Sequence, residues 1–291
     1  KLNNGLTVIL SEDKSLPLIF GVVAVNVGSK NDPHDATGLA HYQEHLLFKG
    51  TEELGTINWE AEKPYIDSIF MMYDLLGATK DNKEREKIQL NINRLSLEAN
   101  KYVIPNELSN LIKEIGGTNL NAGTGNDATY YYSSFPSNKV EHWLEIYSHI
   151  FSKPVFRSFQ AELEVVYEEK NLYNDVFIMP LFEKFGSSFF KKHPYGQQSI
   201  IGTVEHLKNP SLTKMYEFFK TWYVPNNMAL ILCGDFNIEE IKPIIQEKFG
   251  KLKYKELPEN KIWQEEAFKG KEKVTVKMSP IKLALYGYRT P

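Results

Sequence analysis

The sequence predicts an α+β fold in which a mainly antiparallel sheet is packed with helices. Short apolar stretches of strand character are separated by long runs of helical period, instead of alternating regularly with single helices. Two of the strand-like stretches lie close together around a turn, which is typical of an antiparallel hairpin. The chain has 291 residues, enough to bury a large core without a disulfide or a metal.

Strands are predicted in five places along the chain. The stretch at residues 6–11 is followed by residues 18–28, which are nearly continuous in apolar and β-branched residues and are therefore expected in the centre of the sheet. Residues 118–134 are predicted to form a β-hairpin, and residues 227–234 a further strand. New strands are expected to begin within residues 272–288.

Helices fill most of the remaining chain. The first is predicted at residues 38–49. From about 58 to 115 the pattern is helical and highly charged, and it contains two segments, 58–77 and 83–102, joined by turn residues. We expect them to form a helical hairpin inserted into the fold, peripheral to the chemistry and with its charged faces in water. Further helices are predicted at residues 137–152, 158–175, 179–190, 211–222 and 237–248.

The predicted domain organisation divides the chain near residue 255. Residues 1–255 are expected to form one domain that includes the insert at about 55–105. Residues 250–271 are rich in Lys and Glu and have no clear period, so residues 256–291 are interpreted as a linker and the truncated start of a following domain. The chain begins without Met and enters a strand almost at once, so we expect a fragment of a longer protein.

The composition excludes several classes of protein. A hydrophobic fraction of 42% and a charged fraction of 24% are globular values, which excludes a disordered or fibrous chain. A net charge of −3 argues against a nucleic-acid partner bound through a broad basic face. The single cysteine, Cys233, excludes a disulfide framework and is expected to be buried as a small apolar residue. Histidines and acidic residues remain as the groups available for metal or acid–base chemistry.

The motif that can carry chemistry lies on the helix predicted at residues 38–49. His41 and His45 stand at positions i and i+4, on one face, so both imidazoles can reach one ion. Glu44 lies beside that face, and a carboxylate near a metal-bound water is a natural general base. The alternative is an exposed helix face with solvated polar residues. The apolar neighbours of the motif oppose it, because buried His and Glu side chains need partners.

A second predicted helix, at residues 158–175, offers an oxygen ligand. Catalytic zinc usually has three protein ligands and an open position. Glu162 and Glu169 share one helical face with two valines, where a carboxylate is costly unless it is paired or binds metal. Glu164 and Glu168 project elsewhere and are expected in solvent. A charged, exposed helix remains the alternative interpretation.

The segment Gly38–Thr51, with its pattern His41-x-x-Glu44-His45, resembles the inverted-zincin metallopeptidases of the pitrilysin, insulysin and mitochondrial processing peptidase family, peptidase family M16. The insert at 55–105 departs from the usual family pattern and is similar to helical inserts in a bacterial branch. Further blocks resemble the family in the family's order, at Asn3–Val8, Gly116–Thr129, His193–Thr203 and Trp222–Asp235.

The resemblance implies a zinc-dependent endopeptidase that cleaves extended peptides. It implies that Zn²⁺ is held by His41, His45 and Glu169, and that Glu44 acts as the general base toward a metal-activated water. It also implies that the carboxylate of Glu162 supports the site by orienting a ligand.

The resemblance further implies how the peptide is bound. The substrate would add to an edge strand around Asn119, Asn121 and Ala122, through main-chain hydrogen bonds. A second homologous half, in the same chain or in a partner subunit, would complete a clamshell and help to stabilise the oxyanion. We therefore expect this chain alone to turn over weakly or not at all. The bacterial branch suggests the cell envelope or periplasm, with the cytoplasm as the alternative.

Two other classes of function stay open at this point. One is a non-catalytic or partner-dependent subunit of a family heterodimer, although such subunits typically lose ligands and this chain keeps each of them. The other is a domain that binds metal without hydrolysis. Replacing Glu44 by Gln separates a peptidase from both of these classes. A peptidase should lose its activity and keep its zinc, whereas the other two have no activity to lose.

Overall fold

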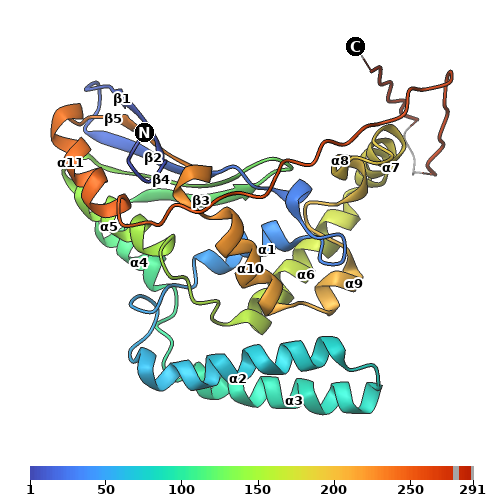
Figure 1. The fold of residues 1–291 in the computed structure, drawn as a ribbon, viewed down its shortest axis with the longest axis horizontal. Helices are drawn as coiled ribbons and strands as arrows, with labels where there is room; N and C mark the ends of the chain where they lie inside the picture. Colours follow the sequence, from blue (N-terminus) through green and yellow to red (C-terminus); the bar gives the residue numbers. More distant parts are fainter. Residues whose placement is uncertain (278–281, 290–291) are drawn as a thin grey trace.

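The computed structural model describes residues 1–277 and 282–289. Within these residues a five-stranded sheet has the order β1-β5-β2-β4-β3 (Figure 1). Three of its four pairings are antiparallel, and β1 runs parallel to β5. The predicted α+β class and mainly antiparallel sheet are confirmed. The strands are β1 (Thr7–Glu12), β2 (Leu18–Val25), β3 (Thr118–Thr124), β4 (Thr129–Pro136) and β5 (Met228–Gly234).

The helices lie mainly on one side of the sheet (Figure 1). Two short ones, α8 and α9, were not predicted, because four or five residues are too few to show a helical period. The helices are α1 (Leu39–Leu47), α2 (Trp59–Ala78), α3 (Asn82–Ala99), α4 (Glu107–Glu114), α5 (Val140–Ile150), α6 (Phe159–Asp175), α7 (Met179–Phe189), α8 (Pro194–Gln197), α9 (Val204–Lys208), α10 (Leu212–Trp222) and α11 (Ile238–Phe249).

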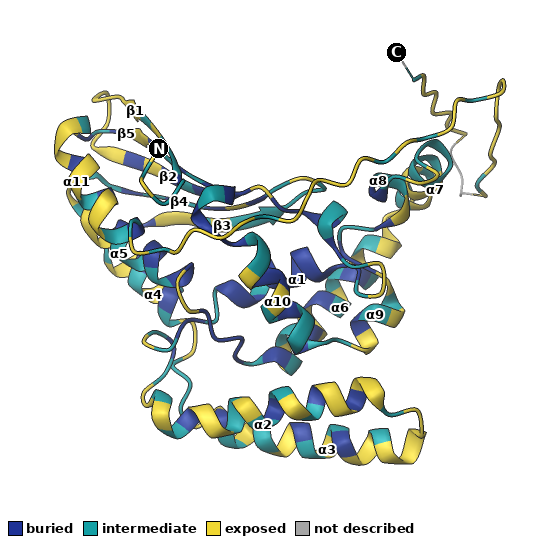
Figure 2. Ribbon diagram, viewed as in Figure 1, coloured by how far each residue is buried: buried dark blue, intermediate teal, exposed yellow. Residues whose placement is uncertain are grey.

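The core lies between the sheet and the helices that cover its inner face. Along β2, alternate residues such as Ile19 and Val23 are fully buried, whereas Phe20 on the opposite face is 44% exposed. Gly21 brings the strand close to α5, since a Cβ there would stand 2.6 Å from the indole of Trp143. Figure 2 shows the same contrast between buried and exposed residues across the molecule. One face of the sheet therefore anchors the helices that carry the site.

The predicted helical hairpin is present as α2 and α3, which lie side by side below the rest of the molecule in Figure 1. Each helix begins at a side-chain cap: Asn58 accepts the N–H of Ala61, and Asp81 accepts the N–H of Glu84. Apolar residues of the two helices, including Ile69 on α2, are buried against each other and against the body of the molecule. Most of the charged side chains face solvent, as predicted, but Glu62 is fully buried.

The strands predicted within residues 272–288 are absent from the described part of that range, and residues 278–281 lie outside it. A strand needs a neighbour to receive its backbone hydrogen bonds, and β1 to β5 form a sheet that this segment does not join. The chain after α11 instead runs past the sheet to the region of α7 and α8 (Figure 1). There Glu265 accepts backbone N–H groups from Lys191, Lys192 and His193.

The division of the chain near residue 255 stays a prediction. None of the helices in the described ranges combines the length and the apolar character of a membrane span.

Candidate metal centre

Helix α1 carries the histidine motif and is fixed at its N-terminal end by a buried carboxylate. Asp32 accepts the backbone N–H of Gly38 at 2.7 Å through Oδ2 and that of Ala40 at 2.9 Å through Oδ1. Gly38 has φ +85°, and a Cβ there would stand 2.7 Å from the carbonyl oxygen of Ile201. The first turn of α1, which contains His41, is thus held against two other segments.

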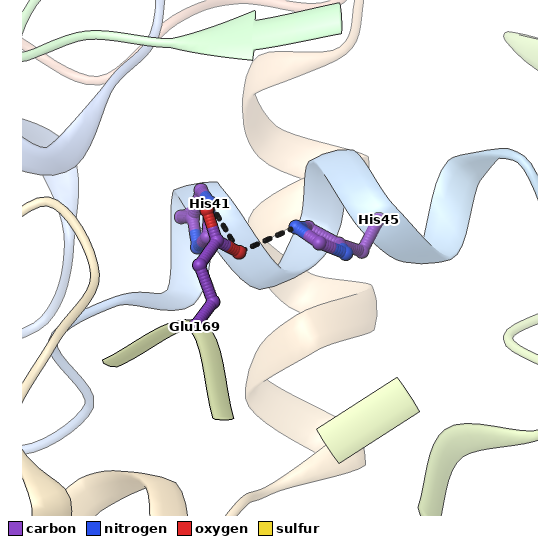
Figure 3. Close-up of side chains that lie close together, drawn as sticks. All are labelled: His41, His45 and Glu169. Atoms are coloured by element: carbon purple, nitrogen blue, oxygen red, sulfur yellow. Dashed lines mark ion pairs between the residues drawn. The ribbon is translucent and has the colours of Figure 1, made fainter. Parts of the chain in front are cut away.

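The structure brings together His41 and His45 of α1 and Glu169 of α6. Each offers one ligand atom, and these atoms all lie within 4.8 Å of one another. Glu169 Oε2 stands 3.6 Å from His41 Nε2 and 3.4 Å from His45 Nε2 (Figure 3). The Glu169 side chain is 46% exposed, so the cluster opens to solvent on one side. Neither Glu164 nor Glu168 belongs to this cluster.

The three side chains fit a zinc ion. Two ligands at about 2.0–2.1 Å from a tetrahedral zinc stand about 3.3 Å apart, close to the separations between Glu169 and each imidazole. Burial, and to a smaller extent the neighbouring charge of His45, lowers the pKa of His41 to about 4. His41 is therefore a neutral imidazole, the form that binds metal. Two imidazole nitrogens and one carboxylate oxygen are a donor set that zinc accepts.

His45 is oriented by Glu162, the other glutamate predicted on α6. His45 Nδ1 lies 2.8 Å from Glu162 Oε1, and Lys49 Nζ lies 2.5 Å from Glu162 Oε2. Burial alone would raise the pKa of Glu162, but the hydrogen bonds from His45 and Lys49 outweigh it and lower the pKa. An ionised Glu162 accepts the Nδ1–H of His45, which leaves Nε2 as the nitrogen that faces Glu169.

The ring of His45 is itself held in a negative environment. Burial acts to lower its pKa, but the hydrogen bond to Glu162 and the charges of Glu162, Glu44 and Glu169 outweigh burial and raise the pKa. A cation at this point would meet the same carboxylates.

Glu44 lies on α1 but outside the cluster. Its carboxylate is buried and accepts a hydrogen bond from the hydroxyl of Thr124, the last residue of β3. Burial raises the pKa of Glu44, and the Thr124 hydroxyl opposes the shift. Thr124 had no predicted role in the site. Strand alternation could have indicated it, because Thr124 shares a strand face with Ala122.

The residues predicted to bind substrate lie on β3, at one edge of the sheet. In the described sheet β3 pairs with β4 alone, and the pairing is interrupted between Thr118 and Asn121. Asn119 sits in this irregularity with φ +54°, and the side chain of Asn121 accepts the N–H of Ala122 at 2.9 Å. Helix α1 packs beside this strand. The edge therefore lies next to the histidines.

Two family models match the chain. The model described as insulinase, peptidase family M16, matches residues 8–61 and 77–203, and the model described as the peptidase M16 inactive domain matches residues 211–291. The first model omits residues 62–76, which belong to α2.

Individual proteins are also similar. An uncharacterised zinc protease, YmfH of Bacillus subtilis, is 32% identical over 99% of this chain and 56% of its own length. The insulin-degrading enzyme of Drosophila melanogaster is 24% identical over 88% of this chain and 22% of its own length. The crystal structure of the first half of the periplasmic protease PqqL from Escherichia coli has a TM-score of 0.68 at 19% identity, covering 91% of this chain and 48% of that one. The chain thus spans between a fifth and little more than half of these proteins.

Proposed function

The chain belongs to the insulinase family of peptidases, peptidase family M16, and we propose that it is the metal-binding part of a zinc-dependent endopeptidase. The observation that carries the proposal is the convergence of His41, His45 and Glu169 from two helices on one point. Three ligands with an open side are the arrangement of a catalytic zinc, whereas a structural zinc is closed by four.

Glu44 transfers the proton in this proposal, and Thr124 and Glu162 position the groups that react or bind metal. When bound, zinc supplies Lewis-acid activation of a water and of the scissile carbonyl. Glu44 accepts the proton of that water and returns it to the leaving amine. Burial raises the pKa of Glu44 and so brings it nearer the working pH, which favours a group that both takes and gives a proton. Thr124 holds the Glu44 carboxylate, and Glu162 holds the ring of His45.

The substrate in this proposal is an extended peptide. It adds to the free edge of β3 around Asn119, Asn121 and Ala122, with main-chain hydrogen bonds giving affinity and side-chain pockets giving selectivity. A second homologous half closes over it, since the chain covers about half of YmfH. We propose a bacterial cell envelope or periplasm as the location, with the cytoplasm as the alternative.

The test is peptide cleavage by the full-length protein under control of its metal. We expect cleavage to disappear when a chelator removes zinc and to return when one equivalent of zinc is added. Glu44→Gln should stay inactive after the same addition. Cleavage that survives chelation would contradict the zinc mechanism. A zinc-loaded wild type that cleaves no peptide would favour the non-catalytic subunit instead.

A further inference from the structure

We propose that the helical hairpin α2–α3 is a positioning element of the metal centre. It holds the start of α6, and so sets where Glu162 and Glu169 stand relative to the two histidines. The inference rests on the metal site proposed above and concerns how the chain keeps it assembled. It replaces the expectation, drawn from charge and period alone, that the hairpin is peripheral.

The first contact is a buried ion pair between the hairpin and the segment that enters α6. Arg157 Nε lies 2.8 Å and 3.0 Å from the two carboxylate oxygens of Glu62, in the first turns of α2. Both side chains are at most 1% exposed. Arg157 Nη1 also donates to the carbonyl of Leu54 at 3.0 Å, in the loop that follows α1. One guanidinium therefore joins α2, the loop after α1 and the segment before α6, in a place where loss of either partner leaves a charge buried alone.

The second observation is the backbone at Ser158, between Arg157 and the first residue of α6. Ser158 has φ +51°, which residues other than Gly rarely adopt. Such a conformation persists where the surroundings fix it from several sides. On one side stands Arg157. On the other, the ring of Phe159 packs 4.8 Å from Tyr73 of α2 and 4.9 Å from Tyr42 of α1. The direction in which α6 leaves this turn is thus set by the hairpin and α1 together.

The third contact reaches the first turn of α6 itself. Gln160 Oε1 accepts hydrogen bonds from the hydroxyl of Tyr73 on α2 and from Nε2 of Gln89 on α3. Both helices of the hairpin therefore hold one side chain of α6. Glu162 follows two residues later and bonds His45. The residue of α6 that the hairpin holds and the residue that holds the metal-site histidine are therefore two positions apart, less than one helical turn.

A small change in the direction of α6 at its start produces a larger displacement of Glu169 further along the helix. Glu169 lies ten residues along α6 from its start, about 15 Å at 1.5 Å per residue. A tilt of about 4° at the start of the helix moves Glu169 by about 1 Å. A metal site tolerates displacements of only about 0.5 Å. Loosening the hairpin contacts should therefore weaken metal binding without touching a ligand.

The test compares two tyrosines of α2 in the full-length protein. Tyr73→Phe removes the hydroxyl that holds Gln160. Tyr65→Phe is the matched control, because the Tyr65 ring stacks on Tyr102 and takes no part in the contacts with α6. We expect Tyr73→Phe to weaken zinc binding about tenfold, the lower end of the effect of residues that orient metal ligands. It should also change the visible spectrum of Co²⁺ bound in place of zinc. Tyr65→Phe should match the wild type in both.

A double variant separates positioning from stability. Glu62→Leu with Arg157→Met replaces the buried ion pair by apolar side chains, an exchange that folded proteins often tolerate with little loss of stability. We expect an unchanged Tm with weaker zinc binding and an altered Co²⁺ spectrum. The inference is overturned if Tyr73→Phe keeps the affinity and spectrum of the wild type, or if affinity falls only in variants whose Tm falls. A wild type that binds no metal would instead overturn the proposed function, and the inference with it.

Discussion

At the scale of single residues, two glutamates near the same histidines stand in opposite environments. Glu44 is buried beneath the end of β3, is held by a hydroxyl and has a raised pKa. Glu169 is half-exposed and places one oxygen within 3.6 Å of both imidazoles. A proton carrier benefits from the first environment and a metal ligand from the second. The two environments are the basis for assigning the two roles.

Thr124 is expected to position the general base. In Thr124→Val the Glu44 carboxylate loses the hydroxyl that orients it. We expect kcat to fall about tenfold, part of the roughly 10²–10⁴ that a positioned base contributes, with zinc content unchanged. Thr124→Ser should restore most of the rate. Thr118→Val, an exposed position on the same strand, should behave as the wild type. Zinc loss from Thr124→Val would show that the hydroxyl supports the metal instead.

At the scale of elements, α1 depends on its buried cap. Asp32→Ala leaves the N–H groups of Gly38 and Ala40 without their acceptor. We expect the free energy of unfolding, measured by urea denaturation, to fall by about 2 kcal/mol. Asp35→Ala is the control, because the Asp35 side chain is 76% exposed in its pair with Lys214 and should change stability by less than about 0.5 kcal/mol. Equal losses in both variants would refute the capping role of Asp32.

The contact between α5 and α11 predicts a dependence of stability on pH. The Lys248 ammonium, and to a smaller extent His149, lower the pKa of Glu145, although burial opposes the shift. A carboxyl with a lowered pKa stabilises the fold above its unfolded pKa, and this stability is lost as the pH falls. Because Glu145 is 43% exposed, we expect at most about 0.5 kcal/mol. Glu145→Gln should remove that part of the acid dependence in unfolding experiments at pH 3 to 7.

The local sequence pattern predicted the helices α1 and α6 and the helical hairpin. It did not predict the long-range contacts that hold these elements in place. The i, i+4 spacing of His41 and His45 is visible in the sequence. The partner of Glu62, in contrast, is 95 residues away, and the partner of Glu44 is 80 residues away. The strands expected in residues 272–288 are absent from the described part of that range for a related reason, since a strand depends on a neighbour that local pattern does not show.

Cys233 illustrates the same limit on one strand. It was expected to be buried, but it is exposed. Strand β5 is apolar along its whole length, so its sequence has no alternation of polar and apolar residues to show which of them face the helices. In the structure Leu232 and Gly234 are buried and Cys233, between them, points to the other face.

At the scale of the whole molecule, the chain holds the proposed metal ligands and base but covers only 56% of YmfH and 22% of the Drosophila insulin-degrading enzyme. The proposed second half would hold the peptide and stabilise the oxyanion. We therefore expect residues 1–291 alone to bind zinc and to cleave peptides at least about 10²-fold more slowly than the full-length protein, the effect of losing one oxyanion donor. Equal rates for the two would show that this chain is catalytically self-sufficient.

In the proposed mechanism Glu169 is a metal ligand and Glu44 is the base. This assignment is tested by measuring zinc content and peptide turnover side by side in Glu44→Gln and Glu169→Gln of the full-length protein. We predict that Glu44→Gln keeps its zinc and loses turnover by roughly 10²–10⁴, whereas Glu169→Gln loses zinc because a charged ligand is gone. A Glu44→Gln protein without zinc, beside a Glu169→Gln protein that retains it, would show that the two glutamates have the opposite roles.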